Sequence, residues 1–516
     1  MAFHFDSAIA DPRRAAPRVA VAVGLIALLL FGLTAAPGVC WQDSGMHQFR
    51  VLNGLLTNPL GLALSHPLHF HLCKLVTAIL PGEPAYLMNL VSALCGAVGV
   101  GALCGLVLTL TGSIRAAAFA AAVLALSHTY WQMSAVTETY SLHAALMILE
   151  WCVLARLART GDGAWLVLLF ALNGLHVANH MLGTLTLVTY VGAAIVIVQR
   201  VRVSALHILA AAIAWGVCTA PYWIIVIEWY QRTGDLAATV HSTFFGGAEG
   251  ARGYAAEVLN ARISLGGLLM SLAYWLYNFP SAAILLALFG VRHIRGGRRP
   301  LFWRTIAVQS VLIFAFVMRY SIHDQVTFFV PICAITALWA GLGAERLMRW
   351  SDVRGRGRGV RNLLVASILA PIAVYAAFPE AARAAGWLQS KMRQLPFRDS
   401  YDHFLRPWRV GDDSAERFAA AALDAAGPGG FVLGNLTVGP MTAYVAQRRD
   451  APTGVRVFSF RESLTIREPS LTDDDLREHL EDGGVVIVAP FADLERYWGE
   501  VFIVERSEPF WRLRER

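Results

Sequence analysis

The chain has 516 residues, of which 56% are hydrophobic and only 15% are charged, against roughly 25% charged in an average soluble domain. Several stretches run for about 18 or more residues with almost no charge, the length a helix needs to cross a bilayer. These features exclude a soluble enzyme, a disordered chain and a nucleic-acid-binding module. The net charge of +7 does not indicate nucleic acid, because the arginines cluster between apolar runs, as the positive-inside rule describes. The sequence predicts a polytopic membrane protein.

About eleven membrane spans are expected, beginning with an uncleaved first span whose N-terminus lies in the cytoplasm. Basic residues then mark every second loop, with the strongest clusters at residues 292–299 and 346–361, and all of them fall on the cytoplasmic side. The expected spans cover residues 17–36, 87–110, 115–132, 140–157, 163–180, 182–199, 204–228, 271–291, 302–319, 326–346 and 362–379.

Two of the expected outer loops are long. The first, at about 37–86, contains an apolar segment from His69 to Leu80 that is too short to span and is expected to lie along the membrane surface. The second, at about 229–262, mixes glycine with charged residues, as a loop over a binding site does. Residues 263–280 are interrupted by Asn278-Phe279-Pro280 and allow a separate re-entrant or interfacial helix as an alternative.

The composition changes after about residue 380. Short β-type runs at 431–433, 455–460, 485–488 and 501–504 alternate with charged helical segments at 414–425 and 473–480. We therefore expect a mainly α protein with two domains: a transmembrane helical bundle at 1–379 and a small soluble α/β domain at 380–516. With eleven spans, the second domain lies outside the cytoplasm.

Ionisable and polar residues gather at the outer ends of the expected spans, where charges are costly and tend to be functional. They are Asp43 after the first span, Glu138 between the third and fourth, His176, Asn179 and His180 at the end of the fifth, and Arg319, Tyr320, His323 and Asp324 at the end of the ninth. Their shared position at one membrane boundary predicts a functional site there.

Structural roles remain open for each of these residues. Asp43 can cap a helix, Glu138 can pair with an arginine, and Arg319 can extend its charge to the interface. His176 and His180 share a helix face at i and i+4, as metal ligands do, but no matching Glu or Cys ligand accompanies them. We therefore expect no metal site.

Short motifs follow one another along the chain: Asp43-Ser44-Gly45, His66-Pro67, Asn89-Leu90-x-Ser92-Ala93, Thr111-Gly112, Tyr130-Trp131, Glu138-x-Tyr140, Gly174-Leu175-x(3)-Asn179-His180, and Tyr320-x(3)-Asp324 with Phe328-Phe329-x-Pro331. In this order they resemble the multi-pass family that includes the animal protein O-mannosyltransferase acting on plexin-type receptor domains, within the GT-C group of membrane glycosyltransferases. The sequence departs from the family pattern at Leu68-His69 and at Thr139.

The resemblance implies transfer of a sugar, possibly mannose, from a polyprenyl-phosphate donor to a protein, lipid or glycan acceptor outside the cytoplasm. It makes Asp43 the general base. Arg50, His180 and Arg319 are candidates for the departing phosphate, and the aromatic rings of Trp41, Tyr140 and Tyr320 for the sugar or the prenyl chain. His66, Glu138, Asn179 and Asp324 complete the predicted substrate-binding set. No metal or cofactor is expected, because side chains can stabilise a lipid monophosphate.

A membrane transporter or lipid flippase is the main competing class, since intramembrane ionisable residues also form translocation paths. Transporters commonly have inverted repeats and sites near the bilayer midplane, whereas this sequence has no evident repeat and its polar residues gather at one boundary. The Ala-, Arg- and Gly-rich composition suggests a bacterial cytoplasmic membrane, with membrane lipids as further partners.

Overall fold

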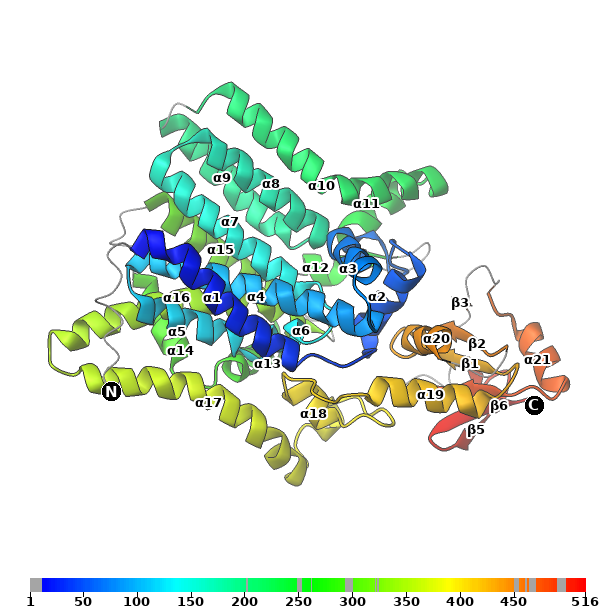
Figure 1. The fold of residues 1–516 in the computed structure, drawn as a ribbon. Coiled ribbons are helices and arrows are strands. Elements are labelled where there is room, and N and C mark those ends of the chain that lie inside the picture. The colour runs from blue at the N-terminus through cyan, green and yellow to red at the C-terminus, as the bar shows by residue number, and fades with distance from the viewer. Residues whose placement is uncertain are drawn as a thin grey trace.

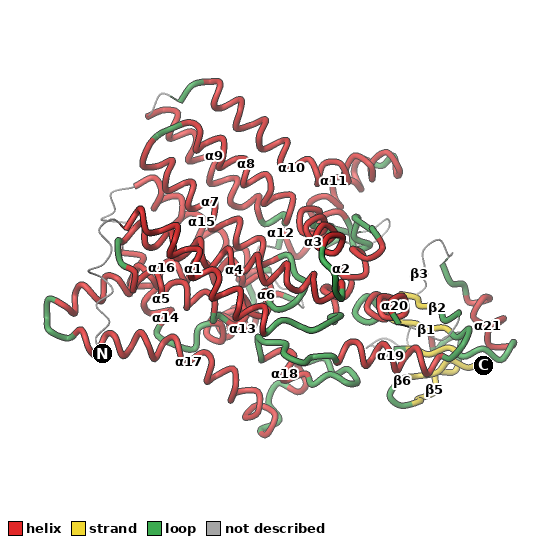
Figure 2. Tube along the Cα trace, in the orientation of Figure 1, coloured by secondary structure: helices red, strands yellow, loops and turns green. Residues whose placement is uncertain are grey.

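The chain folds into a bundle of long helices with a small α/β domain beyond one end of the bundle (Figure 1). The computed structural model describes residues 12–200, 203–247, 253–260, 262–292, 300–320, 322, 324–449, 454–459, 462–463, 470–489 and 498–516. Among the described residues, the strands begin at Phe431 with β1, and they alternate with the helices α20 and α21 (Figure 2).

Every expected span coincides with an apolar helix or helix pair. In the described part of the chain, seven helices are long and apolar enough to cross a membrane, or eight if one bent pair counts as a span. The predicted total of eleven is reached only when three shorter apolar helices, α5, α8 and α9, are included. The bundle comprises α1 Pro12–Leu33, α4 Pro84–Thr111, α5 Ile114–Ala125, α6 His128–Ser134, α7 Tyr140–Thr160, α8 Gly163–Asn179, α9 Gly183–Arg200, α10 Ala205–Thr233, α13 Leu265–Asn278, α14 Ala283–Gly290, α15 Pro300–Arg319, α16 Val330–Asp352 and α17 Gly357–Ala384.

Two expected spans are broken. The span expected at 115–132 is divided between α5 and α6, which starts at His128. The span expected at 271–291 lies across α13 and α14, which meet at an angle of 102°. Pro280 is the second residue after the end of α13, and a proline cannot donate the backbone hydrogen bond that a continuous helix needs. The interruption noted at Asn278-Phe279-Pro280 is therefore a sharp bend.

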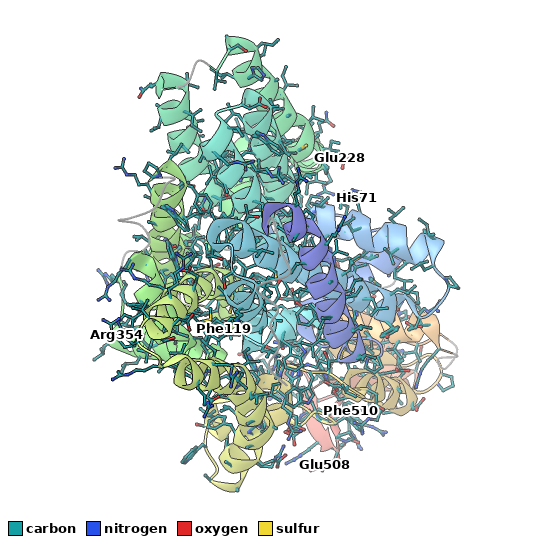
Figure 3. The ribbon with its side chains drawn as sticks, turned by 60° about the vertical axis from the view of Figure 1, so that its left-hand side comes forward. His71, Phe119, Glu228, Arg354, Glu508 and Phe510 are labelled. Atoms are coloured by element: carbon teal, nitrogen blue, oxygen red, sulfur yellow. The ribbon has the colours of Figure 1, made fainter. Side chains whose placement is uncertain are left out.

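The outer loops fold into short helices at the end of the bundle nearest the α/β domain. These are α2 Gln42–Asn53, η1 Leu62–Leu64, α3 Pro67–Ile79, α11 Leu236–Phe245, α12 Ala255–Leu259 and η3 Gln325–Phe329. The apolar segment expected at His69–Leu80 forms most of α3. Arg354, in the basic cluster at 346–361, lies on the opposite side of the bundle from His71 of α3, as the predicted sidedness requires (Figure 3).

The C-terminal domain contains a six-stranded sheet in the order β3-β2-β1-β4-β6-β5. Strand β1 pairs in parallel with β2 and β4, whereas β3 and β6 join as antiparallel strands. The predicted β-type runs correspond to β1, β2, β4 and β5. Its elements are α18 Ser400–Leu405, α19 Ser414–Ala426, β1 Phe431–Gly434, α20 Gly439–Arg448, β2 Arg456–Ser459, β3 Glu462–Ser463, α21 Asp473–Glu481, β4 Val486–Val488, β5 Ile503–Ser507 and β6 Phe510–Arg514.

One hydrophobic core joins the C-terminal domain to the first outer loop. Trp41 and Phe49 of the loop pack with Phe418, Met441 and Tyr444 of the domain in this cluster. The larger core lies among the bundle helices and is separate from it. The base of the C-terminal domain and the helix α2 are therefore built as one packed unit.

Candidate active site

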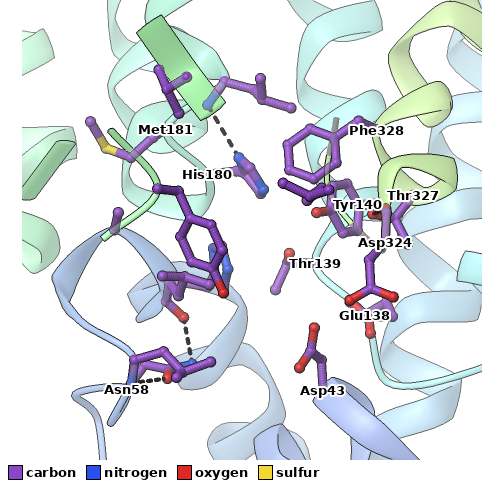
Figure 4. Close-up of a pocket in the computed structure, with 18 of the residues that line it drawn as sticks. Asp43, Asn58, Glu138, Thr139, Tyr140, His180, Met181, Asp324, Thr327 and Phe328 are labelled. Carbon is purple, nitrogen blue, oxygen red and sulfur yellow. Dashed lines mark hydrogen bonds between the residues drawn. The ribbon is translucent and has the colours of Figure 1, made fainter. Parts of the chain in front are cut away.

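A cavity of about 340 Å³ opens at the end of the bundle nearest the C-terminal domain, where the segments that follow several spans converge. Asp43, Glu138 and Asp324 lie near one another, His180 lies across the cavity from Asp43, and the rings of Tyr140 and Phe328 adjoin Asp324 (Figure 4). Its lining includes Asp43, His47, Arg50, Asn58, His66, Glu138, Thr139, Tyr140, His180, Met181, Tyr254, Phe316, Tyr320, Asp324, Thr327 and Phe328.

The acidic side of the cavity is formed by Asp43, Glu138 and Asp324, which come from three distant parts of the sequence. Asp43 lies in the first turn of α2, Glu138 in the loop before α7, and Asp324 immediately before η3. Topology explains their convergence, because each residue follows or precedes a span at the same end of the bundle.

Burial sets the protonation of two of these acids. Burial, and to a smaller extent the charge of Asp324, raises the pKa of Asp43 to about 6. Burial and the charge of Asp43 raise the pKa of Glu138 to about 8, although a hydrogen bond from the Ser44 hydroxyl to Glu138 Oε1 at 3.0 Å opposes the rise. Near pH 7, Asp43 is therefore mainly a carboxylate, whereas Glu138 mainly holds its proton.

The backbone of Glu138 is fixed by Ser92 of α4. The Glu138 N–H donates to Ser92 Oγ at 3.0 Å, and Ser92 Oγ donates to the Glu138 carbonyl at 3.1 Å. Ser92 Oγ also lies 3.3 Å from His69 Nε2, whose ring nitrogen Nδ1 is 3.0 Å from His47 Nε2. A line of hydrogen-bonding groups thus runs behind the cavity from His47 to the loop that carries Glu138.

The histidine side of the cavity has defined ring tautomers, because each ring meets a backbone group. The Leu182 N–H donates to His180 Nδ1 at 3.1 Å, so the proton of a neutral His180 is on Nε2. His66 Nδ1 lies 2.8 Å from the Asn179 carbonyl and must donate to it. The two rings stack with centroids 4.9 Å apart. Burial lowers the pKa of His66 to about 4, which keeps this ring neutral.

Aromatic rings close the wall next to His180. Phe328 contacts Tyr140 at 5.5 Å and Tyr320 at 4.7 Å between ring centroids, and Tyr140 contacts His180 at 5.1 Å. These rings present apolar faces with polar edges, a surface that suits both sugars and isoprenoid chains.

Arg50 lines the cavity but its guanidinium is already bound to the protein. Its side chain is only 2% exposed. It donates to the backbone carbonyls of Leu55 at 3.1 Å and Ser65 at 3.0 Å, and also to that of Leu56. Arg50 therefore ties the loop between α2 and α3, while its charge remains in the cavity wall, and its predicted contact with phosphate stays a prediction.

Three other residues of the predicted set do not line the main cavity. Arg319 donates to the Asn260 carbonyl at 2.5 Å and lies over the ring of Phe316. Asn179 donates to the Thr139 carbonyl at 3.0 Å. Trp41 is buried against the C-terminal domain. Each of these side chains has a partner within the protein, which sequence alone did not reveal.

His176 is part of a buried network inside the bundle rather than of the cavity lining. Its Nδ1 lies 2.8 Å from Glu150 Oε1, and its Nε2 lies 2.5 Å from His143 Nδ1. Tyr190 and Asn173 also donate to Glu150. His176 therefore contributes to polar packing between the helices of the bundle. His323 lies outside the described residues.

Sequence reasoning missed a group with the composition of a metal site. His47, His69 and Cys73 place their nitrogen and sulfur atoms within 4.8 Å of one another. Their spacing also fits hydrogen bonding, since His69 joins His47 to Ser92 as described above. The i, i+4 spacing of His69 and Cys73 on α3 was the available signal, but His47 joins them only through the fold.

A smaller cavity of about 110 Å³ lies on the other side of the acidic residues. Asp43, Glu138 and Asp324 line both cavities. The remaining wall of the smaller cavity includes Trp41 from the first outer loop and His403, Phe404, Arg409 and Asp412 from the segment that leads into the C-terminal domain. The three carboxylates therefore belong to a wall that the two cavities share.

Comparison with known families identifies part of the chain. Residues 65–205 match the family described as protein O-mannosyl-transferase TMEM260 N-terminal domain. This segment includes His66, Glu138, Tyr140 and His180 of the cavity, but neither Asp43 nor Asp324. The resemblance inferred from the motifs is confirmed over this range. No curated protein matches the sequence significantly.

Comparison with solved structures covers nearly the whole chain. ArnT from Cupriavidus metallidurans bound to undecaprenyl phosphate is 15% identical, with a TM-score of 0.54, and the match covers 96% of this chain and 97% of that chain. The apo structure of the same protein is 16% identical, with a TM-score of 0.56 and 96% coverage of both chains. The chain therefore has an ArnT-like GT-C fold and is a multi-pass membrane protein. The family match, to an O-mannosyl-transferase domain, and the fold agree with the predicted class of GT-C-type glycosyltransferase.

Proposed function

We propose that this protein transfers a sugar from a polyprenyl-phosphate donor to a hydroxyl group outside the cytoplasm, with Asp43 as the general base. The observation that carries the proposal is the position of Asp43, on the wall shared by two cavities at the outer end of the bundle. A donor in one cavity and an acceptor hydroxyl in the other meet at this carboxylate.

The reaction requires one bond to form and one to break at the anomeric carbon. The acceptor oxygen attacks this carbon, its proton passes to the Asp43 carboxylate, and the bond between the sugar and the phosphate oxygen breaks with its electron pair on the leaving phosphate. With its raised pKa, Asp43 is a stronger base than an exposed aspartate and is still ionised near neutral pH. Glu138, which mainly holds its proton, can donate a hydrogen bond to the substrates.

The larger cavity suits the lipid-linked donor. Its aromatic wall accommodates the sugar and the first isoprene units, and His180 offers the Nε2 proton to the departing phosphate. The buried positive charge of Arg50 adds electrostatic stabilisation without direct contact. Undecaprenyl phosphate, the lipid bound to ArnT in the similar structure, supports a donor of the same chemical class.

Mannose is the first sugar to test, because the matching family is one of O-mannosyl-transferases. The smaller cavity suits the acceptor hydroxyl, whether that of a protein, a lipid or a glycan. The membrane is the cytoplasmic membrane of a bacterium, and the site faces away from the cytoplasm.

Labelled donors test the proposal and its main alternative together. Membrane vesicles containing the protein are incubated with polyprenyl-phosphate mannose radiolabelled in the sugar, beside vesicles without the protein. We expect label to leave the lipid fraction and enter an acceptor only when the protein is present. Movement of intact donor across the bilayer with no transfer of label, from this or any other polyprenyl-phosphate sugar, would instead indicate a flippase.

A further inference from the structure

The first turn of α2, which carries Asp43, begins with a residue in an unfavourable backbone conformation. Gln42, directly before Asp43, has a φ of 57° although it is not glycine. Residues with a Cβ rarely adopt this left-handed conformation, and such strain persists only where surrounding contacts enforce it. The direction in which the Asp43 side chain points therefore depends on the contacts that keep Gln42 in this conformation.

The group that holds Gln42 belongs to the C-terminal domain. The Gln42 N–H donates to the carbonyl of Thr437 at 3.2 Å, nearly 400 residues away in the sequence. Thr437 lies in the short loop between β1 and α20, at the carboxyl end of a central parallel strand. This loop is itself braced, because Asn435 Oδ1 accepts from the Thr437 N–H at 2.9 Å and Arg393 donates to Thr437 Oγ1 at 2.7 Å.

The neighbouring residue Trp41 is held by the same domain. Its Nε1 donates to Ser414 Oγ at 2.8 Å, and its ring packs edge-on against Phe418 with centroids 5.2 Å apart. The guanidinium of Arg398 lies 5.2 Å from the centre of the Trp41 ring. Two consecutive residues before the base are thus fixed by groups outside the bundle.

The surroundings of Gly45 show how closely α2 packs against the C-terminal domain. A Cβ at this position would lie 3.0 Å from Met441 Cβ in α20 and 2.2 Å from the carbonyl of Cys40. The contact between α2 and α20 therefore leaves no space for the first turn of α2 to relax.

We propose that the C-terminal domain is a positioning element for the catalytic base, with the Asn435–Thr437 loop holding Gln42 in the conformation that directs Asp43 into the cavities. This inference rests on the proposed function of Asp43. In it, Asn435 and Ser414 are positioning residues that do not touch the substrates.

The test uses the full-length protein and replacements at Asn435. Asn435→Ala removes the side-chain oxygen that braces the loop, whereas Asn435→Asp keeps an oxygen at the same place. Gln447→Ala is the matched control, because Gln447 accepts an exposed hydrogen bond from Asn53 at the other end of α2, at 3.0 Å. Hydrogen exchange of the Gln42 amide and transfer kinetics are measured for each variant.

We expect the Gln42 amide to exchange at least about 10-fold faster in Asn435→Ala, because its hydrogen bond to Thr437 is weakened. The turnover number falls about 10-fold while the KM for the donor stays within about twofold, a smaller loss than the hundredfold cost of a 1 Å displacement. If the variant leaves Asp43 less buried, the pKa of this carboxyl falls, and the rise of turnover with pH moves to lower pH. Asn435→Asp and Gln447→Ala behave as the wild type does.

The outcomes separate the inference from the proposed function. Wild-type exchange and turnover in Asn435→Ala overturn the positioning role, even when Asp43→Asn is inactive and the function stands. Absence of any sugar transfer by the wild type overturns the proposed function, and the exchange rates then decide alone whether the loop holds the turn.

Discussion

The two sides of the main cavity differ in the way that their charges are controlled. On the acidic side, burial raises the pKa of Asp43 and of Glu138, and the charge of Asp324 raises both further. On the histidine side, backbone groups fix the ring tautomers of His66 and His180, and burial keeps His66 neutral. The acidic side is suited to accept a proton. On the histidine side, His180 Nε2 is suited to donate a hydrogen bond to an anion, whereas His66 gives its single proton to the Asn179 carbonyl.

The two sides also differ in what supports them. The first turn of α2, which carries Asp43, is held by the C-terminal domain through Gln42 and Trp41. The histidine side is supported within the bundle and its loops, through the Asn179 carbonyl and the Leu182 N–H. Substitutions that remove the contacts between α2 and the C-terminal domain should therefore affect proton transfer. Substitutions near the end of α8 should affect donor binding.

Of the substitutions that test the difference between the two sides, Gly45→Ala is expected to lower turnover the most. The new Cβ meets the Cys40 carbonyl at 2.2 Å, so the first turn of α2 must shift. A displacement of about 1 Å at a catalytic group costs about 100-fold in rate. Turnover should fall by this amount in protein that is still folded by circular dichroism. Gly192→Ala, which has nothing within 4 Å of its Cβ, is the control and should keep wild-type turnover.

His180→Ala tests the histidine side. Loss of the Nε2 donor should raise the KM for the lipid-linked donor about 10-fold or more, because a hydrogen bond to a charged group contributes about 1.5–3 kcal/mol. The pH dependence of turnover should stay unchanged. His71→Ala, on the exposed face of α3, serves as the control. Unaltered donor kinetics in His180→Ala would remove this residue from the phosphate site.

The pH profile sharpens the description of the acidic side. Because protonated Asp43 cannot accept a proton, turnover should be low below pH 6 and rise as pH increases through about 6, the pKa of this carboxyl. Asp324→Asn removes a neighbouring negative charge and should move this rise to lower pH, toward the ordinary value for aspartate. The profile is measured with saturating donor. A midpoint that does not respond to Asp324→Asn contradicts the coupling between the two carboxyl groups.

Arg319→Ala should give the smallest effect of the series. Its guanidinium donates to the Asn260 carbonyl, beside α12, rather than to the cavity. Loss of one such hydrogen bond, worth about 1 kcal/mol, should change donor KM by no more than about fivefold. A loss comparable to that of His180→Ala, restored by Arg319→Lys, would return Arg319 to the phosphate site.

The sequence was sufficient to place the acidic side because span ends are readable from hydropathy. Once Asp43, Glu138 and Asp324 are assigned to the same membrane boundary, their approach follows from topology. The apolar helices and the β-type runs were predicted for the same reason, since period and composition are local properties.

Side-chain partners could not be predicted in the same way. Arg50 and Arg319 both seemed suited to phosphate, but the carbonyls that bind them come from loops whose path is set by the fold. Trp41 meets Ser414 across 373 positions of the sequence. No local sequence pattern indicates a contact between residues so far apart in the chain. The packing of α2 against the C-terminal domain was therefore found only in the structure.

Asp43→Asn tests the central claim most directly. Asparagine keeps the size and shape of the side chain but cannot accept the acceptor's proton, and loss of a general base costs about 10²–10⁴-fold in rate. Transfer by purified, folded Asp43→Asn protein is measured with saturating donor, and donor binding is measured separately. We expect turnover to fall in this range with donor binding retained. Turnover within a few-fold of the wild type would contradict the account and assign the base to another residue, with Glu138 and Asp324 the next to test.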